Sequence, residues 1–439
     1  MQRNVAVIVE VEKKNFYSLT SIIATFDENK ELQSVPLFIE TLIDNIKIKN
    51  YLEKYEFLII AMSFRTAQIG YIYDKLNNIY NTLSQSDLKR ILFVAGGSHA
   101  TGDPESTLKL GFDFAFIGEG ELSFIDFVQR LKNGDDIYST KGIAYLEKEM
   151  ERVVVTPAPS LIKLDNYPFF SVKRKLFPPL EITRGCAFGC TFCQVPSMYH
   201  KKVRHRSTEK IVEIVKWLAN NKMGDIRFIT PNSFGYMAQK PREVKIEAIE
   251  HLLSSIREVK GVRKIFYGTF PGEVRPETVS VELMEIVKPL ITNRRISIGL
   301  QSGNDEILEN IRRGHTVDEG LQAIDIIMKM GFRAIVDFIY GLPNATLEQE
   351  MDSIDVMKKL IAKGAIVRPH VFMPLPGTQL EHEGYGQVPR EVRVIFGNMA
   401  SNGQIEGSWT VQEKYAKEAW DTIKRVEAYP KITRKDSQL

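Results

Sequence analysis

Short apolar runs alternate with longer amphipathic stretches over the first third of the chain. Four of these runs are rich in β-branched or aromatic residues and span residues 5–9, 57–62, 91–95 and 114–117. Apolar runs of four to six residues, separated by helical patterns, indicate parallel strands that are covered on both faces. We therefore predict a doubly wound, Rossmann-like α/β domain at this end of the chain.

Small and polar residues follow three of these predicted strands. Ligands of open parallel sheets bind outside the carboxyl ends of the strands, so we expect the three loops to line one site. The loops are Ser63-Phe64-Arg65-Thr66, Gly96-Gly97-Ser98-His99-Ala100-Thr101 and Gly118-Glu119-Gly120-Glu121.

The sequence pattern changes near residue 156, from strand-like runs to a stretch rich in proline. Residues 142–146 and 153–155 flank a charged turn, which predicts a terminal hairpin and ends the first domain at about residue 156. Between residues 157 and 179 five prolines interrupt any regular element. We interpret this stretch as the linker between two domains.

Six further strand-like runs follow the linker, at residues 180–183, 226–230, 264–269, 295–299, 333–339 and 370–373. Helical patterns follow the first five runs, at residues 208–219, 244–258, 278–287, 317–330 and 347–363. This alternation predicts a partial (β/α)6 barrel over residues 180–378, with its chemistry on the loops at the carboxyl ends of the strands. Residues 379–439 read as a mainly helical C-terminal extension to which we assign no chemistry.

Composition narrows the possible classes. The chain has 439 residues, of which 44% are hydrophobic, enough for two sizeable cores. Lysine and arginine number 58 against 55 acidic residues, so composition gives no indication of nucleic-acid binding. The first apolar run is shorter than a signal-peptide core, and no later run reaches a membrane-spanning length. We therefore expect a soluble cytoplasmic protein.

The three cysteines of the chain, Cys186, Cys190 and Cys193, lie within eight residues. An odd, tightly clustered set does not form a disulfide framework, which favours a reducing compartment and a metal or catalytic role. Electron-transfer [4Fe–4S] proteins supply one thiolate to each iron of the cubane. If these cysteines hold a cubane, three thiolates leave one iron open to a substrate or cofactor.

A structural zinc site is the alternative, with His200 or His205 as a fourth ligand beside the three thiolates. Structural zinc usually supports a small module without its own core, whereas these cysteines open a much larger domain. Gly185 and Gly189 indicate a loop wrapped closely around a bound group, which argues against three unrelated buried cysteines.

The segment Glu181-Ile-Thr-Arg-Gly-Cys186-Ala-Phe-Gly-Cys190-Thr-Phe-Cys193 resembles the radical S-adenosylmethionine (SAM) superfamily, with an aromatic residue before the last cysteine. In that family the free iron chelates the amino and carboxylate groups of SAM, and one electron cleaves the sulfonium to give a 5'-deoxyadenosyl radical. Residues 298–303 and 313–316 resemble the region of the fourth strand that contacts the ribose and methionyl part. Residues 337–343 resemble the motif of the fifth strand beside the adenine.

The end of the second barrel strand departs from the family pattern. A Gly-Gly-Glu motif usually grips the amino group of SAM there, whereas residues 230–234 read Thr-Pro-Asn-Ser-Phe. Asn232 or Ser233 can accept that hydrogen bond. The SAM contacts that the resemblance implies are Phe192, Asn232, Ser233, Glu273, Arg275, Gln301, Ser302 and Asp337.

Three tyrosines near strand ends, Tyr236, Tyr267 and Tyr340, either meet the substrate or pack in the core. We take Tyr340 as the candidate catalytic residue among them. The basic segment of residues 201–206 either steers an acidic electron donor or substrate towards the cluster or forms a solvated turn.

The front domain resembles the cobalamin-binding domains that are fused to a subset of this superfamily, and its two glycine loops carry the resemblance. The Asp-x-His-x-x-Gly motif that ligates cobalt in other cobalamin proteins is absent. We therefore expect no histidine on the lower face of cobalt, Arg65 beneath the metal, and His99 as a loop residue that caps backbone groups near the corrin edge. The predicted cobalamin contacts are Ser63, Phe64, Arg65, Thr66, Gly96, Gly97, Ser98, His99, Thr101, Gly118, Glu119 and Gly120.

The resemblance implies a cobalamin-dependent methyltransferase that uses SAM twice. One SAM methylates reduced cobalamin, and another gives the radical that removes hydrogen from an unactivated sp3 carbon, which then takes the methyl group from cobalt. Electrons would come from ferredoxin or flavodoxin. We expect a protein side chain as substrate, with a glutamine of methyl-coenzyme M reductase as the named candidate.

Three alternatives stay open at this point. A cyclase or rearrangement enzyme would keep both cofactors. A methylthiotransferase acting on transfer RNA would carry additional front-domain cysteines, and the sequence has none. A non-catalytic interaction protein stabilised by zinc would bind no iron.

Overall fold

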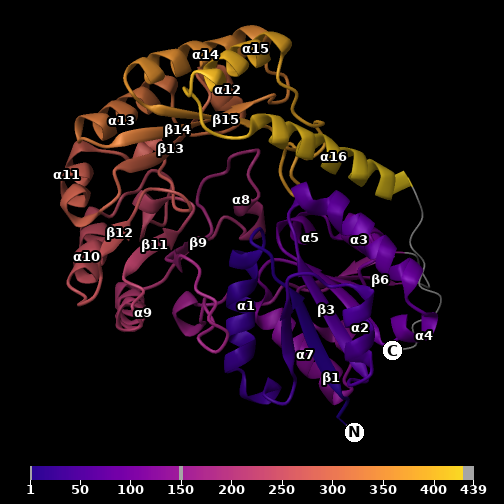
Figure 1. Ribbon diagram of the computed structural model, residues 1–439. Coiled ribbons are helices and arrows are strands. Elements are labelled where there is room, and N and C mark those ends of the chain that lie inside the picture. Colours follow the sequence, from indigo (N-terminus) through magenta and orange to yellow (C-terminus); the bar gives the residue numbers. More distant parts are fainter. Residues whose placement is uncertain (1, 148–151, 429–439) are drawn as a thin grey trace. The chain divides into compact units, whose positions relative to one another are not determined.

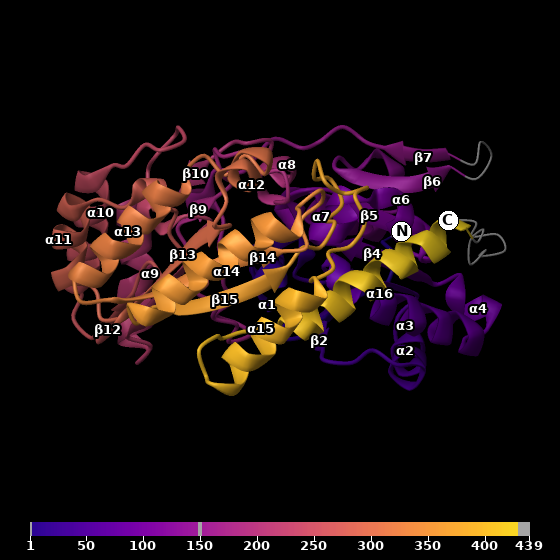
Figure 2. The same ribbon diagram turned by 90° about the horizontal axis from the view of Figure 1, so that it is seen from above.

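The computed structural model describes residues 2–147 and 152–428 (Figures 1 and 2). Its contacts divide the chain into two units. The first unit runs to Pro178 and includes Leu375–Gly377 and the described chain from Glu418 onward. The second unit comprises Pro179–Pro374 and Thr378–Lys417, so the boundary between the units falls at the end of the predicted linker.

Seven strands of the described chain form the sheet of the first unit, in the order β2-β1-β3-β4-β5-β6-β7. The strands β1 to β5 pair in parallel, and β6 and β7 form the predicted antiparallel hairpin at one edge, whose turn lies outside the described residues. The strands are β1 (Val5–Glu10), β2 (Leu37–Glu40), β3 (Phe57–Ser63), β4 (Ile91–Gly96), β5 (Phe114–Phe116), β6 (Ile143–Glu147) and β7 (Arg152–Val155).

Helices cover both faces of this sheet, which confirms the doubly wound prediction. The alternation along β1 shows why its run is continuously apolar: Val5, Val7 and Val9 join one core cluster, whereas Ala6 and Ile8 join the other. The first cluster includes residues of α1 (Phe16–Glu28) and α7 (Gly120–Asn133), and the second includes residues of α2 (Asn45–Leu52) and α3 (Ile69–Thr82). Shorter helices are α4 (Gln85–Leu88), α5 (Ser98–Gly102) and α6 (Pro104–Lys109).

The second unit is a partial barrel of parallel strands. Its parallel strands form two sheets, β12-β11-β8 and β13-β14-β15, which an isolated parallel bridge between Val274 and Ile298 links, and β9 and β10 form a separate antiparallel pair. The strands are β8 (Leu180–Glu181), β9 (Thr183–Arg184), β10 (Arg204–His205), β11 (Asp225–Ile229), β12 (Lys264–Phe266), β13 (Arg295–Gln301), β14 (Arg333–Tyr340) and β15 (Ile366–Val371).

The helices of this unit lie mainly outside the strands (Figure 1). They are α8 (Val195–Met198), α9 (Thr208–Asn220), α10 (Ile246–Arg257), α11 (Val281–Leu290), α12 (Asp305–Asn310), α13 (Val317–Lys329), α14 (Leu347–Ala362) and α15 (Arg390–Ser401), together with the part of α16 (Trp409–Ala428) that precedes Glu418. No helix of the described ranges combines the length and the apolar character that crossing a membrane requires.

Three details differ from the sequence-based expectations. The prediction missed β2, a short edge strand in which only the first residue is buried. It placed the last barrel strand at residues 370–373, whereas β15 spans Ile366–Val371, because two polar residues interrupt its apolar pattern. The described part of the predicted extension of residues 379–439 does not stand by itself, since Thr378–Lys417 belongs to the second unit, while Ala419 and Val426 enter a core cluster of the first.

Gly97 follows β4 and has a φ of 93°, a conformation that L side chains rarely adopt. A Cβ at this position would lie 2.7 Å from Ser63 Oγ and 2.8 Å from the carbonyl oxygen of Phe64. The loop after β4 therefore approaches the loop after β3 as closely as only glycine permits.

We predict that Gly97→Ala lowers the free energy of unfolding of the first unit by about 1–3 kcal/mol, because it adds both backbone strain and a steric clash. Gly96→Ala is the matched control, since a Cβ there meets nothing within 4 Å. Urea denaturation monitored by circular dichroism measures both variants. Equal destabilisation by the two substitutions would contradict this reading of the loop.

Candidate active site

The three cysteines lie on the loop that follows β9 in the second unit. The backbone N–H of Cys193 donates to the carbonyl of Cys190 at 3.2 Å, which curls the loop. Gly185 opens the loop with a φ of 87°, where a Cβ would overlap the carbonyl of Lys202. Gly185 is therefore required by the close approach of the Lys202 backbone, and not by the bound group that the sequence suggested.

Two buried guanidinium groups point at one thiol. Arg275 Nη1 lies 3.4 Å and Arg313 Nη1 3.5 Å from Cys190 Sγ, and the two arginines are only 5% and 6% exposed. Burial opposes ionisation of Cys190, but Arg313 and Arg275 outweigh it and lower the pKa of this thiol. Burial raises the pKa of Cys186, and it raises that of Cys193 to about 11. Cys190 is therefore the cysteine whose surroundings favour the thiolate form before any metal binds.

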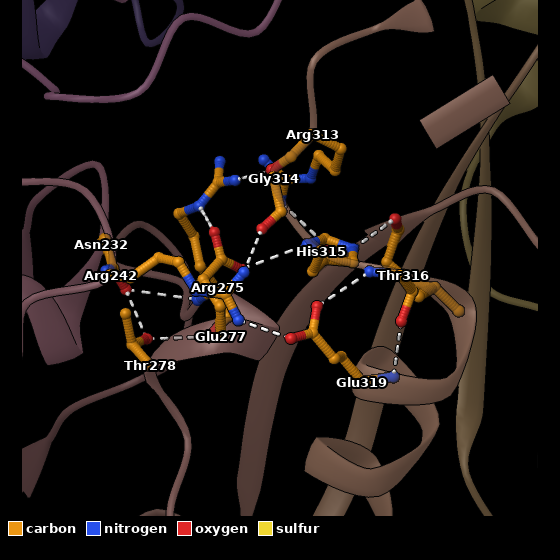
Figure 3. A network of polar contacts seen from close by, with 12 residues as sticks. Asn232, Arg242, Arg275, Glu277, Thr278, Arg313, Gly314, His315, Thr316 and Glu319 are labelled. Carbon is orange, nitrogen blue, oxygen red and sulfur yellow. Dashed lines mark hydrogen bonds and ion pairs between the residues drawn. The ribbon is translucent and has the colours of Figure 1, made fainter. Parts of the chain in front are cut away.

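A chain of charged side chains holds these arginines in place (Figure 3). Arg275 Nε donates to Glu277 Oε1 at 2.6 Å, and Glu277 Oε2 lies 3.1 Å from His315 Nδ1. His315 Nε2 lies 3.2 Å from the carbonyl of Leu300, so both ring nitrogens of His315 face acceptor oxygens. Burial opposes ionisation of Glu277, yet His315 and Arg275 lower its pKa to about 2.

Backbone and aromatic contacts complete the surroundings of the cysteine loop. Arg313 Nη2 donates to the carbonyl of Gly299 at 2.7 Å, and Arg275 donates to the carbonyl of Arg313. The guanidinium carbon of Arg275 lies 3.6 Å from the ring centroid of Phe188. Phe192 packs against an apolar cluster that includes Leu342 and Phe372.

The donor set fits an iron–sulfur cubane. Three thiolates around a cubane in its usual oxidised state leave a net negative charge, which the two buried guanidinium groups offset. Arg313 Nε and the hydroxyl of Thr191, next to Cys190, are buried atoms without a hydrogen-bond partner in the described chain. A bound group at the cysteine loop would give these two atoms a partner.

The same geometry bears on zinc. No three His, Cys, Asp or Glu side chains of the described residues converge as the ligands of a single ion would. The thiolates of a cubane bind different irons and need not converge on one point. His205 Nδ1 lies 2.9 Å from Thr183 Oγ1, and its Nε2 lies 2.9 Å from the carbonyl of Ala238, so its ring is already engaged within the protein. Of the two histidines considered as a fourth zinc ligand, only the exposed His200 remains.

Two of the predicted SAM contacts connect to the arginines. Asn232 Oδ1 accepts from the backbone N–H of Arg275 at 3.2 Å, which ties the loop after β11 to the arginine beside the thiol. Gln301 ends β13 at an irregularity of the strand with a φ of 79°, next to Gly299, which contacts Arg313. Arg275, which the prediction also included, contacts the thiol itself.

Two other predicted SAM contacts have structural roles, which corrects those assignments. Ser233 is fully buried, and its hydroxyl donates to the carbonyl of Gly272 at 2.7 Å. Ser302 is 2% exposed, lies 3.3 Å from the hydroxyl of Ser353 and accepts from the backbone N–H of Asn304. Both hydroxyls hold backbone segments in place and are not presented to a ligand.

Glu273 and Asp337 belong to a separate charged group. Arg368 donates to both carboxylate oxygens of Asp337, at 2.6 and 2.7 Å, and to Glu273 Oε1 at 3.0 Å. His370 Nε2 lies 3.2 Å from Asp337 Oδ1. Burial and the charge of Asp337 raise the pKa of Glu273 to about 7.

Sequence reasoning missed Arg368 and His370. A signal was present, because the two residues alternate along β15 and therefore project from one face of the strand.

Tyr340 is a core residue, which corrects its assignment to catalysis. Its side chain is 1% exposed, its hydroxyl donates to Met357 Sδ at 2.9 Å, and its ring meets that of Phe396 edge-on at 4.8 Å. Tyr236 and Tyr267 are likewise fully buried, with hydroxyls that donate to the carbonyls of Arg206 and Ser233. Packing is thus the role of all three tyrosines.

The first unit brings together the three loops predicted to bind cobalamin. His99 Nδ1 lies 3.1 Å from Thr66 Oγ1, which joins the loops after β3 and β4. The backbone N–H of Gly118 donates to Thr101 Oγ1 at 3.1 Å, which joins the loops after β4 and β5. The carboxyl edge of the sheet is therefore one continuous surface, as a shared ligand site requires.

His99 is not the loop residue that we expected. It lies in α5, is fully buried, stacks on Phe64, and places Nε2 3.0 Å from Ser106 Oγ. Burial lowers its pKa to about 4, so the ring is neutral and bonds hydroxyls in place of backbone groups. Phe64 is 1% exposed and also stacks on Phe112.

The remaining members of the predicted cobalamin set divide by exposure. Ser63, Thr66 and Glu119 are buried, and Glu119 accepts from the backbone N–H of Ile162 at 3.2 Å. The other members are exposed or partly exposed at this edge: Arg65, Gly96, Gly97, Ser98, Thr101, Gly118 and Gly120.

Sequence reasoning missed two polar residues after β1. Asn15 Nδ2 donates to the carbonyls of Glu10 and Ser63, and the hydroxyl of Ser18 lies 2.8 Å from that of Ser63. Together they tie the end of β1 to the end of β3.

Comparison with known proteins identifies the fold of the cysteine-bearing unit. Residues 180–357 match the family model described as the radical SAM superfamily. The second unit belongs to this superfamily. A radical SAM unit implies a [4Fe–4S] cluster and SAM as cofactors, in agreement with the three-thiolate loop.

Curated relatives match a larger share of the chain than the family model does. The chain is 27% identical over 307 residues to an uncharacterized methyltransferase of Pyrococcus horikoshii, covering 66% of this chain and 62% of that protein. The chain spans about three fifths of the length of the first curated relatives that it matches.

Solved structures of two radical SAM proteins share the fold of both units. TsrM from Kitasatospora setae, a radical SAM methyltransferase solved with cobalamin and a [4Fe–4S] cluster, matches with a TM-score of 0.63 at 14% identity, over 87% of this chain and 74% of its own. OxsB, a cobalamin-dependent radical SAM enzyme, matches with a TM-score of 0.64 at 18% identity, over 99% of this chain and 57% of its own. At these identities the likeness is one of fold.

We predict that Arg313→Met lowers the midpoint potential of the reconstituted cluster by on the order of 100 mV, because a nearby positive charge stabilises the reduced cluster. Arg312→Met is the matched control, since Arg312 is exposed and its loss changes the net charge equally. Redox titration followed by electron paramagnetic resonance measures the potential. The same shift in both variants would show that Arg313 does not act through its contact with the thiolate.

We also predict that Tyr340→Phe leaves SAM cleavage unchanged and lowers the free energy of unfolding by about 1 kcal/mol, because it removes one buried hydrogen bond. Formation of 5'-deoxyadenosine and a urea denaturation curve test the two parts. Loss of cleavage at unchanged stability would return Tyr340 to the catalytic residues.

Proposed function

We propose that the protein is a cobalamin-dependent radical SAM methyltransferase that adds a methyl group to an unactivated sp3 carbon. The observation that carries the proposal is a loop of three thiolates, with Cys190 prepared by Arg275 and Arg313, in a chain with no fourth cysteine. An open iron for SAM follows from that ligand count. The superfamily membership of this unit supports it.

The assignment of cobalamin rests on the first unit. Its three joined loops at the carboxyl edge of a doubly wound sheet offer a ligand surface where such folds bind their cofactors. Gly97 supports this role, since its missing side chain leaves the backbone of the loop accessible. The likeness in fold to TsrM and OxsB adds support.

The residues of this chain hold and tune cofactors that supply the hydrogen abstraction and the methyl group. Cys186, Cys190 and Cys193 would ligate the cluster, and Arg275 and Arg313 would offset its charge. Arg65 and the glycines after β4 and β5 would contact the corrin. The buried His99 already uses both ring nitrogens, so it would support this surface from below without ligating cobalt.

The competing functions differ from the proposed one in whether a methyl group is transferred and in which metal centres they need. A cyclase or rearrangement enzyme would form deoxyadenosine without transferring a methyl group. A methylthiotransferase would need further cysteines for a second cluster, and the three in this sequence all lie on one loop. A zinc-stabilised binding protein is disfavoured by the engagement of His205.

A protein side chain is our proposed substrate. Glutamine of methyl-coenzyme M reductase is the first candidate to test. Ferredoxin or flavodoxin is the proposed electron donor.

The test is anaerobic reconstitution with iron, sulfide and hydroxocobalamin, followed by incubation with reductant, candidate peptides and SAM that carries a deuterated methyl group. We expect 5'-deoxyadenosine and a peptide that has gained the deuterated methyl, both measured by mass spectrometry. The control replaces all three cysteines with alanine and should form neither product. Deoxyadenosine from that control, or zinc in place of iron in the reconstituted protein, would refute the proposal.

A further inference from the structure

A cavity of about 210 Å³ lies in the second unit, and Gly341, Leu342 and Pro343, at the end of the stretch that resembles the adenine motif, form part of its wall. It lies where β14 and β15 end, between the loop of residues 341–345, Phe372 and the segment of residues 383–389. In barrels of this kind, ligands bind at the carboxyl ends of the strands. The cavity therefore occupies the edge of the barrel at which a substrate is expected.

Glu350, in the first turn of α14, contributes a carboxylate to this cavity. It is 7% exposed, and its Oε1 accepts from the backbone N–H of Gly341 at 2.6 Å. Its Oε2 is buried and has no hydrogen-bond partner in the described chain. An ionised carboxylate oxygen left in this state is costly, and burial accordingly raises the pKa of Glu350 to about 7. A ligand that donates a hydrogen bond to Oε2 would remove that cost.

The remaining walls indicate the chemistry of this ligand. Glu383 adds a second carboxylate, Phe372 and Tyr385 are aromatic, and Leu342 is apolar. The residues that line the cavity include no lysine, arginine or histidine, so every charge that Glu350 and Glu383 bring to it is negative. Acidic and aromatic walls together suit a cation on an apolar stem.

The single free oxygen of Glu350 distinguishes between the two common organic cations. A guanidinium group binds best through two parallel hydrogen bonds to both oxygens of one carboxylate. Because Gly341 already occupies Oε1, an ammonium group matches the remaining oxygen better.

The cavity also adjoins the cysteine loop. Leu342 and Phe372 line it and belong to the apolar cluster against which Phe192 packs. The cavity and the cysteine loop therefore share one apolar cluster.

We propose that this cavity binds the ammonium group of a lysine in the protein substrate and so positions the chain for methylation at a neighbouring residue. The role of the lysine as part of a substrate rests on the proposed function, whereas the binding of an ammonium group in the cavity does not. Glu350 is its specificity-determining residue.

The test uses the anaerobically reconstituted protein and three probes: Nα-acetyl-lysine methylamide, its neutral norleucine analogue and n-butylamine. Calorimetry should show that the lysine probe binds and the norleucine analogue does not. Glu350→Gln keeps the acceptor for Gly341 but places an amide donor in the cavity, and we expect it to weaken lysine binding about tenfold or more. Glu348→Gln, an exposed residue of the same helix turn, should leave binding unchanged.

Glu350→Gln should also unfold at a higher temperature than the wild type, because it removes a buried carboxylate, so weaker binding would not reflect misfolding. Equal binding of the lysine and norleucine probes, or unchanged lysine binding in Glu350→Gln, would overturn the proposal. Binding of n-butylamine as tight as that of the lysine probe would overturn the assignment to a peptide. Weaker binding of SAM to Glu350→Gln would place the cavity in the cofactor site and also overturn it.

These outcomes remain distinct from failure of the proposed function. Lysine binding without methyl transfer would preserve the site and refute the methyltransferase. Methyl transfer to a peptide that lacks lysine, at the same rate as to one that contains it, would refute the site and preserve the methyltransferase.

Discussion

The contact of two buried guanidinium groups with one thiol is the constraint on which the second unit depends. Arg275 and Arg313 carry like charges in a nearly dry environment, and burial together with Arg275 lowers the pKa of Arg313. Such an arrangement is stable only where negative charge is close by. Glu277 supplies part of it, and the thiolate of Cys190 supplies the rest. The segments after β12 and β13 are therefore held together by the same charges that prepare the cluster ligands.

The first unit is organised in a comparable way without charge. Hydroxyls and a neutral imidazole join the loops after β3, β4 and β5. The polar atoms of these side chains therefore already have hydrogen-bond partners within the protein. Backbone and glycines are what remain at the surface of this edge, along with Arg65. A large planar cofactor can be held by such a surface through close backbone approach. In both units, then, side chains that sequence patterns suggest as ligand contacts serve largely to position the loops.

This division explains what the sequence could predict. The strands of the doubly wound sheet and most of the barrel were readable, because burial on both faces leaves continuous apolar runs such as that of β1. The cysteine loop was readable because its ligands are local. The partnership of Arg275, Glu277 and His315 was not, since it joins segments almost forty residues apart in sequence. Tyr340 was misassigned because a position near a strand end does not reveal which face the side chain takes, and here that face packs on α14.

Gln412 lies in the C-terminal stretch to which sequence patterns assigned no chemistry, yet it determines which ring nitrogen of His370 carries the proton. Gln412 Oε1 accepts from the backbone N–H of Val371 at 3.0 Å, so its Nε2 must face His370 Nδ1, also at 3.0 Å, as a donor. A neutral His370 then carries its proton on Nε2, and this N–H donates a hydrogen bond to Asp337 Oδ1. Asp337 in turn binds Arg368, which reaches Glu273. Through one amide, α16 therefore sets the direction of hydrogen bonding across the charged group that joins β14, β15 and the loop after β12.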